Sequence, residues 1–179
     1  MIIVIGGRAG SGKSTIAKLV AKKLKLKHYS MGDLQRSIAK ERGVSLLELG
    51  ELEEKDPAID KELDNKQKEL GENNDNFVID GRMSAFFIPN SIKIFLDGDE
   101  RTRAERILKD GRETEKNSSI KEAIKNMKKR EESENKRFEQ YYGMRCYDKS
   151  KYDAVIDTTN LKIGQVVEKV IEAVKSREH

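Results

Sequence analysis

The sequence predicts an α/β fold in which a five-stranded parallel sheet is covered by helices on both sides. The chain has 179 residues, which fits one domain, and 36% of them are hydrophobic. Its first residues, Met1 to Ile5, form a continuous apolar run of the kind that a central buried strand needs. Strand-like and helical patterns then alternate along the chain, which is typical of parallel sheets.

The first unit is a strand, a glycine-rich turn and a helix. Glycines interrupt the apolar run between residues 6 and 12. Residues 13–24 then place apolar side chains on one face of a predicted helix: Ile16, Leu19, Val20 and Leu24.

The segment from residue 32 to residue 71 predicts short helices without a strand. Ser45 and Glu48 have the spacing of a capping box. Asp56 followed by Pro57 predicts an N-cap and a first helical position. About forty residues are long for a simple connection between strands, so this segment is expected to be an inserted lid or an arm that holds a substrate.

The second half returns to the alternating pattern. It predicts three further strand segments, at 77–79, 92–96 and 155–156. It also predicts three helices. The first spans about 100–109, the second begins with a capping box at 119–122 and ends at about 142, and the third spans 163–174. A short polar loop is predicted at 112–118, between the first two.

The composition excludes several classes of protein. No apolar run approaches the roughly 20 residues that cross a bilayer, and the start does not resemble a secretory signal. Cys146 is the single cysteine, so an internal disulfide and a cysteine-ligated zinc site are excluded. With two histidines, His28 and His179, a histidine metal site or a Ser-His-Asp triad has little material, and His28 is interpreted as structural. We expect a cytoplasmic protein.

The net charge of +4 does not by itself indicate a nucleic-acid partner. Acids gather at residues 48–64 and basic residues at 101–112. Such runs predict two solvated helical faces.

The sequence from Gly7 to Ser14 matches the phosphate-binding loop pattern G-x-x-x-x-G-K-[ST]. Glycines let successive backbone N–H groups face one anion, and the helix that follows presents its positive end to the same phosphates. We expect ATP to be bound by the loop and its next residue: Gly7, Arg8, Ala9, Gly10, Ser11, Gly12, Lys13, Ser14 and Thr15.

Two oxygen donors near this loop are candidates for Mg²⁺. The Ser14 hydroxyl is the loop's usual Mg²⁺ ligand, and Lys13 supplies positive charge to the β and γ phosphates. Asp80 follows an apolar strand, at the edge where ligands bind in such sheets, and is expected near Mg²⁺ through a water molecule. An Asp-Gly turn that only ends the strand is the alternative.

The chain is rich in arginine and offers no histidine base. A hydroxyl acceptor needs a base, whereas a phosphate acceptor is already largely ionised at neutral pH. The composition therefore favours phosphoryl transfer to a phosphate. Arg103 and Arg106 share one helical face. A second helical face carries Arg130, Glu134 and Arg137, and spacing alone favours a solvated position for it.

These motifs together resemble the nucleoside monophosphate kinases, and within them the archaeal-type cytidylate kinases. The turn from Ser30 to Arg36 is similar to the family's monophosphate-binding turn. The similarity is spread over nearly the whole chain and includes residues 1–15, 64–67, 80–82, 94–97, 103–106 and 157–161.

The resemblance implies a phosphate-loop (P-loop NTPase) three-layer fold in a single domain. Its core would comprise residues 1–31, 72–102 and 143–179. Residues 32–71 would form the monophosphate-binding arm, and residues 103–142 a short lid and a long helix.

The resemblance also implies roles for individual residues. Arg36 and Arg82 would grip the acceptor phosphate. Arg103 and Arg106 would act catalytically beside the transferred group, with Lys13. The rest of the acceptor site would comprise Arg130, Arg137 and Glu134, the last near the base.

The implied activity is transfer of a phosphoryl group from ATP to CMP, and also to dCMP, with Mg²⁺ as cofactor. Another monophosphate or a small phosphorylated metabolite as acceptor is the first alternative. A nucleotide-dependent switch that binds nucleic acid or a protein is the second, and the 6% aromatic content gives it little support. We expect a monomer that acts on small molecules, with no membrane partner.

Overall fold

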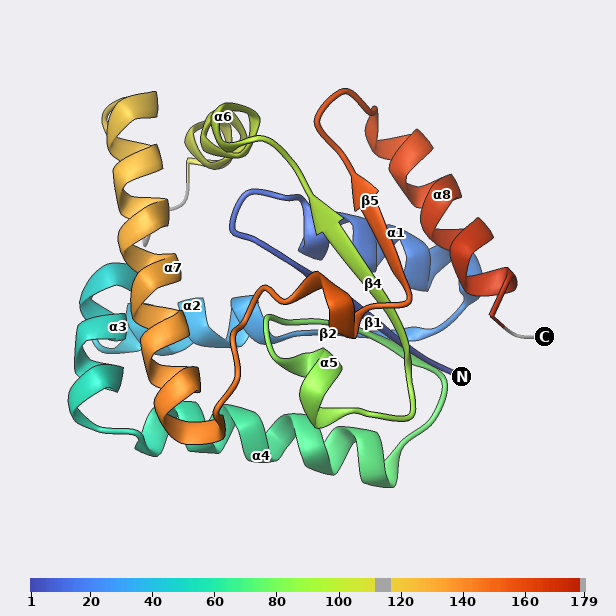
Figure 1. Cartoon of the computed structure of the whole chain (residues 1–179), viewed down its shortest axis with the longest axis horizontal. Coiled ribbons are helices and arrows are strands. Elements are labelled where there is room, and N and C mark those ends of the chain that lie inside the picture. The colour runs from blue at the N-terminus through green and yellow to red at the C-terminus, as the bar shows by residue number, and fades with distance from the viewer. Residues whose placement is uncertain (112–116, 178–179) are drawn as a thin grey trace.

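The computed structural model describes residues 1–111 and 117–177, in which five parallel strands form one sheet (Figure 1). The strand order is β2-β3-β1-β4-β5. The strands are β1 (Ile2–Gly7), β2 (Lys27–Ser30), β3 (Phe77–Asp80), β4 (Ile92–Asp97) and β5 (Ala154–Asp157). The predicted fold class is confirmed.

The strand β2 is the one that the sequence analysis did not locate. It has four residues at the edge of the sheet, and none of its side chains is fully buried. A short edge strand has a weak apolar signal, because one side of it faces no neighbouring strand. The other four strands agree with the predicted ranges to within two residues.

The helices predicted at 13–24, about 100–109, 119–142 and 163–174 agree with the structure to within one residue, whereas no helix was predicted at 84–87 or 149–151. The helices of the structure follow in chain order. They are α1 (Lys13–Leu24), α2 (Met31–Glu41), α3 (Leu46–Lys55), α4 (Ala58–Asn73), α5 (Ser84–Phe87), α6 (Glu100–Asp110), α7 (Ile120–Tyr142) and α8 (Ile163–Lys175), with a 3₁₀ turn η1 (Lys149–Lys151).

The cap of α4 differs from the prediction by one position. The capping box of α3 is present, with Ser45 and Glu48 each bonded to the other's backbone. In contrast, Pro57 rather than Asp56 is the N-cap of α4. The Asp56 carboxylate still accepts a hydrogen bond from the backbone N–H of Ala58, so it caps the helix from one residue further away.

The sheet is covered on both faces. On one face α1 and α8 bury the apolar side chains of alternate strand positions, including Ile3, Ile5 and Leu96. On the other face α5, the end of α7 and the segment after it cover Val4, Ile79 and their neighbours. Cys146 is buried in this second core.

The predicted arm, residues 32–71, is helical and has a small core of its own. Ala39, Leu46, Leu49, Ile59 and Leu63 form this core between α2, α3 and α4. The helix α3 packs along α7 and α2 contacts β3, so the arm meets both the long helix and the sheet (Figure 1).

Parallel pairing brings the carboxyl ends of the strands to one edge of the sheet. Ile5 pairs with Asp80, Gly7 with Leu96, and Asp97 with Asp157. The predicted lid loop follows α6, and its residues 112–116 lie outside the described part of the chain. No helix in the described ranges has the length and apolar character of a membrane span.

Candidate active site

The loop between β1 and α1 curves around the end of a cavity of about 840 Å³. Gly10 and Gly12 have φ angles of 76° and 87°, which favour glycine because a Cβ is strained there. Gly12 is also the N-cap of α1, so the positive end of this helix faces the cavity. Residues 9–15 all line the cavity, whereas Gly7 and Arg8 lie outside its lining.

Lys13 is the loop's cation. Its ammonium is 3.4 Å from the carbonyl oxygen of Arg8. Burial lowers the pKa of Lys13 to about 8, although the carboxylate of Asp80 opposes the shift. An anionic ligand in the cavity would favour the charged form, so phosphate binding and protonation of Lys13 support each other.

Asp80 ends β3 directly behind the loop and is fully buried. Its Oδ2 accepts hydrogen bonds from the hydroxyls of Ser14, at 2.6 Å, and Ser30, at 3.0 Å. Its Oδ1 lies 2.8 Å from His28 Nε2. The Asp80 carboxylate therefore orients Ser14. Its three side-chain partners give it a role beyond that of an Asp-Gly turn that only ends the strand.

His28 belongs to this cluster, and its contact could not have been read from the sequence. It lies on β2, the strand without a predicted range, and the parallel register places Ser30 opposite Asp80. His28 orients a carboxylate of the site, which extends its predicted structural role.

The donor atoms near Ser14 suit Mg²⁺. Hydroxyl and carboxylate oxygens are hard ligands, and Mg²⁺ in nucleotide sites takes one or two protein oxygens together with phosphates and water. Within the described ranges no group of three or more His, Cys, Asp or Glu side chains could hold a metal alone. Ser14 is thus the residue that would hold Mg²⁺, with Asp80 orienting it.

Three of the predicted acceptor arginines, Arg36, Arg82 and Arg130, line the same cavity as the loop. Arg36 pairs with Asp33 on its own helix. Arg82 contacts Glu134 and the side-chain oxygen of Gln35. Burial disfavours the charge of Arg82, but Glu134, Tyr147 and Glu53 together outweigh this effect and raise the pKa of Arg82.

Glu134 holds two of these arginines. Its Oε1 accepts from Arg130 at 2.9 Å and from Arg82, and its Oε2 accepts from the Tyr147 hydroxyl. Glu134 is only 2% exposed. Burial alone would raise its pKa, yet Arg82 and Arg130 reverse this effect and lower the pKa of Glu134. Tyr147 is a residue that sequence analysis missed, since it follows α7 in a segment without a motif.

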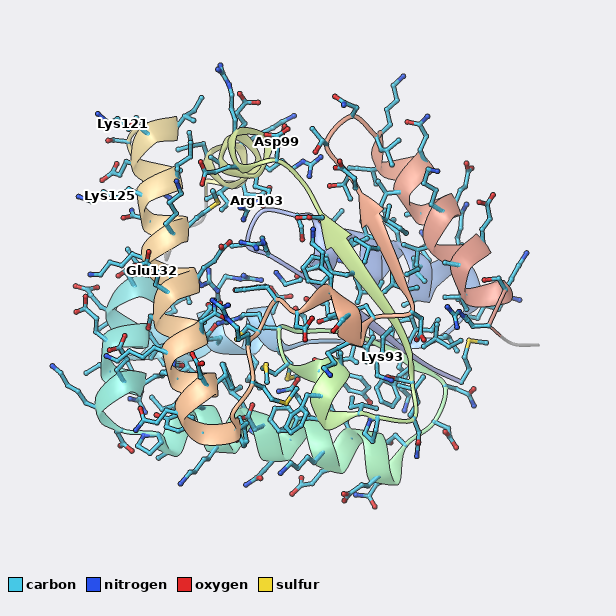
Figure 2. The ribbon with its side chains drawn as sticks, viewed as in Figure 1. Lys93, Asp99, Arg103, Lys121, Lys125 and Glu132 are labelled. Atoms are coloured by element: carbon cyan, nitrogen blue, oxygen red, sulfur yellow. The ribbon has the colours of Figure 1, made fainter. Side chains whose placement is uncertain are left out.

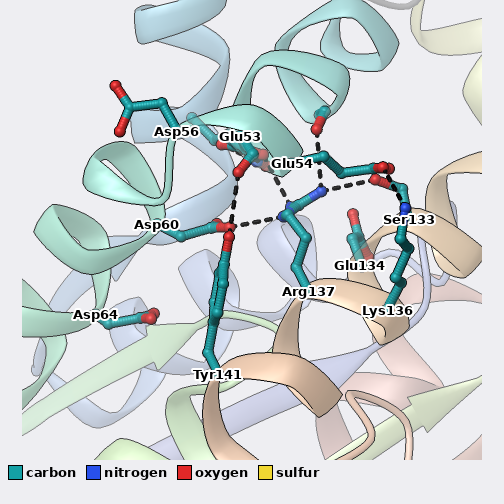
Figure 3. Close-up of polar contacts among 12 residues, drawn as sticks. Glu53, Glu54, Asp56, Asp60, Asp64, Ser133, Glu134, Lys136, Arg137 and Tyr141 are labelled. Carbon is teal, nitrogen blue, oxygen red and sulfur yellow. Dashed lines mark hydrogen bonds and ion pairs between the residues drawn. The ribbon is translucent and has the colours of Figure 1, made fainter.

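Arg137 lies outside the large cavity, in a buried network between α7 and the arm (Figure 3). Its guanidinium is 2.8 Å from Glu53 and 2.6 Å from Asp60. It also donates to the Ser133 hydroxyl at 2.8 Å.

The prediction that the face with Glu134 and Arg137 is solvated is wrong, because both side chains are buried. The same prediction for the acids at 48–64 is wrong for Glu53, Asp60 and Asp64, which are buried, and is confirmed for Glu51, Glu54, Asp56 and Glu62, which are exposed. The charged face of α7 and the buried acids of the arm are partners of each other, since Arg137 pairs with Glu53 and Asp60. Burial raises the pKa of Glu53, and it raises the pKa of Asp64 to about 7.

Arg103 and Arg106 share a helix but have different surroundings. Arg106 lines the cavity and donates to the side-chain and backbone oxygens of Thr158, both at 2.8 Å. Arg103 does not line the cavity and is 5% exposed. Spacing alone shows a shared face and leaves open which neighbours each guanidinium meets.

Similarity to known proteins shows the family of this chain. A model of the cytidylate kinase-like family matches residues 2–160. A cytidylate kinase from Sulfurisphaera tokodaii is 38% identical over 175 residues, which cover 97% of this chain and 94% of that protein. A cytidylate kinase from Methanothrix thermoacetophila is 40% identical over 158 residues, 88% of each chain.

Solved structures support the fold. A shikimate kinase from Bacteroides thetaiotaomicron aligns over 98% of both chains with a TM-score of 0.66 at 17% identity. An uncharacterized protein from Eubacterium ventriosum aligns over 99% of both chains with a TM-score of 0.70 at 24% identity. The fold, the phosphate loop and the near-complete matches lead to one conclusion: this chain belongs to the cytidylate kinase-like family of nucleoside monophosphate kinases.

Proposed function

We propose that this protein transfers the γ-phosphoryl group of ATP to CMP and releases ADP and CDP, with Mg²⁺ as cofactor. The observation that carries the proposal is a single cavity lined by Lys13 of the loop and by three acceptor arginines, Arg36, Arg82 and Arg130. Two phosphate groups need such a site, because their mutual repulsion must be offset while they approach.

The chemistry asks for position and charge rather than a base. The acceptor phosphate is already an anion at neutral pH, so its oxygen attacks without first losing a proton. The loop N–H groups and Lys13 would hold the donor phosphates, and the arginines would hold the acceptor. Mg²⁺, held by Ser14, would neutralise phosphate charge.

The acceptor arginines gain orientation from the buried acids. Glu134 fixes Arg82 and Arg130 before a ligand arrives. A pre-oriented guanidinium loses less conformational entropy when it binds a phosphate in bidentate geometry. This arrangement supports the acceptor role of both arginines.

CMP as the preferred acceptor is supported by the names of the relatives. Glu134 and Arg137 as residues near the base remain predictions. Both line a smaller pocket between α3 and α7, beside Arg130. Use of dCMP is part of the proposal.

The test is ADP release from ATP and Mg²⁺ in the presence of CMP, dCMP, UMP, AMP, GMP or no acceptor. We expect CMP to stimulate turnover most. A stronger response to another monophosphate would contradict the CMP assignment and leave the kinase assignment in place. No response to any acceptor would contradict both, and salt-sensitive RNA binding without turnover would then favour the switch.

A further inference from the structure

The phosphate loop and the helix α6 share one carboxylate, that of Glu131 on α7. Its Oε2 lies 2.6 Å from Nη1 of Arg8 in the loop. Its Oε1 lies 2.8 Å from Nη1 of Arg103 on α6. Glu131 is 9% exposed and Arg103 is 5% exposed, so the contact between these two is largely shielded from water, whereas the side chain of Arg8 is 35% exposed.

Arg103 binds the loop directly as well. Its Nη1 donates to the carbonyl oxygen of Ala9 at 3.1 Å, and its Nε donates to that of Gly98 at 3.1 Å. A Cβ on Gly10 would overlap the backbone of Arg103, so the loop packs tightly on the start of α6. The guanidinium of Arg103 is therefore directed at the protein side of the loop rather than at the cavity.

The loop is thus fixed from outside the cavity. On its inner side the backbone N–H groups and Lys13 remain for the phosphates, while the outer curve at Arg8, Ala9 and Gly10 is held by α6 and α7. Figure 2 shows Arg103 beneath α6, on the side of the loop between β1 and α1.

The same helix also carries acceptor residues. Arg130 precedes Glu131 and lines the cavity, and Glu134 follows within one turn. A continuous helix keeps these residues at a constant spacing. Movement of Glu131 relative to the loop would therefore change the distance between the donor loop and the acceptor arginines.

We propose that Glu131 is a positioning residue that holds the phosphate loop, through Arg8 and Arg103, in register with the acceptor arginines of α7. Arg103 then contributes by fixing the loop, not by touching the transferred group. This inference rests on the proposed function. Misplacement of the loop should lower the rate of transfer more than the affinity for the acceptor, because transfer depends on the alignment of two phosphates.

The test compares Glu131→Gln with Glu139→Gln, a change at an exposed residue of the same helix. Glutamine keeps the size of the side chain and removes the charge that holds two arginines. We expect Glu131→Gln to lower kcat about tenfold or more, with KM for CMP within about twofold of the wild type. Glu139→Gln should match the wild type in both constants.

A double-mutant cycle separates positioning from general destabilisation. Arg8→Gln and Glu131→Gln each remove the same bridge, so the double variant should lose little more rate than the poorer single variant. Losses that multiply would overturn the proposal. If Glu131→Gln fails to fold, Glu131→Asp keeps the charge at a shorter reach, and it should also lower kcat; an unchanged kcat in that variant would overturn the proposal.

A second measurement, ADP affinity by calorimetry without any acceptor, separates this inference from the proposed function. We expect Glu131→Gln to weaken ADP binding several-fold and Glu139→Gln to leave it unchanged. If the protein binds ADP but uses no monophosphate, the proposed function is wrong, and so is the register of the loop with an acceptor site. Weaker ADP binding by Glu131→Gln would in that case still support the conclusion that Glu131 holds the phosphate loop. Unchanged ADP affinity together with unchanged kcat would overturn the role of Glu131 altogether.

Discussion

The proposed donor and acceptor sides of the cavity are built in different ways. On the donor side a short, continuous piece of chain curves so that its own backbone faces the ligand, with glycines at the positions of positive φ. On the acceptor side the cations come from separate elements, and buried acids hold several of them. Arg82 lies in the turn after β3 and meets Glu134 of α7, which is 52 residues away in the sequence.

The difference lies in what each side needs before a ligand arrives. Backbone N–H groups carry partial charges and are held by local geometry, so they require no counter-ion. Buried guanidinium groups carry full charges, and without partners their burial would cost several kcal/mol. The acceptor side therefore depends on its acids for folding, whereas the donor side depends on its glycines and on outside support.

The largest effect should come from breaking the buried network of charges around Arg137, between α7 and the arm. Arg137→Met leaves Glu53 and Asp60 without their cation, and we expect a loss of about 3–5 kcal/mol in the free energy of unfolding. Urea denaturation measures this loss. The control is Lys136→Met, on the same helix as Arg137. It removes an exposed ion pair with Glu54 of α3 and should cost less than about 1 kcal/mol. Equal effects of the two changes would contradict the distinction between buried and exposed pairs.

On the donor side, removal of a charge should affect rate rather than stability. Lys13→Ala should lower kcat about 10²- to 10³-fold, roughly 3–4 kcal/mol, because the cation stabilises charge on the transferred group. The melting temperature should stay close to that of the wild type. Lys18→Ala, at an exposed position of α1, is the matched control. Turnover within a few-fold of the wild type would exclude Lys13 from the donor site.

The pH dependence of stability should come from the acceptor side. Burial raises the pKa of Asp64 from its ordinary 3.8 to about 7, so the folded protein retains a proton that the unfolded chain has lost. The contribution of protonated Asp64 to the free energy of unfolding is therefore fully present below about pH 4 and is lost as the pH rises through 7.

Asp64→Asn removes this titration. Between pH 5 and pH 8 the wild type should lose on the order of 2 kcal/mol relative to this variant, less than the full shift implies because the protein relaxes around the charge. Denaturation curves across this range give the difference. Glu69→Gln, at an exposed position of α4, should follow the wild-type profile. Parallel profiles for wild type and Asp64→Asn would refute the assignment.

The smallest effect should be the most selective. Arg36→Ala should raise KM for CMP roughly tenfold and leave KM for ATP within about twofold, since Arg82 and Arg130 still hold the acceptor. Initial rates at varied CMP and varied ATP measure both constants. Arg42→Ala, an exposed change at the end of α2, should alter neither. Equal changes in both constants would remove Arg36 from the acceptor side.

Most of the fold could be predicted because its signals are local. The apolar strands, the capping box at Ser45, the N-cap at Ser119 and the amphipathic closing helix each depend on residues within one turn or one strand. At Ser119 the predicted box is only half formed, because the Glu122 carboxylate accepts from Ser118 instead. The strand β2 was missed because an edge strand of four residues has little apolar pattern of its own. The phosphate loop could be recognised because its function depends on local backbone geometry.

The pairing of charges was decided by the tertiary structure. In the sequence, the acids at 48–64 and the charged face of α7 both fit solvated helices, because helical spacing shows which residues share a face and not what covers that face. Only the packing of the arm against α7 brings Asp60 to Arg137, 77 residues apart, and only the parallel register brings Ser30 to Asp80. The sequence alone thus predicted the phosphate loop and the family of the chain. The tertiary structure showed which arginines line the cavity and which lie outside it, and that His28 contacts Asp80, Tyr147 contacts Glu134 and Glu131 contacts Arg8 and Arg103, because those contacts join elements that no local pattern connects.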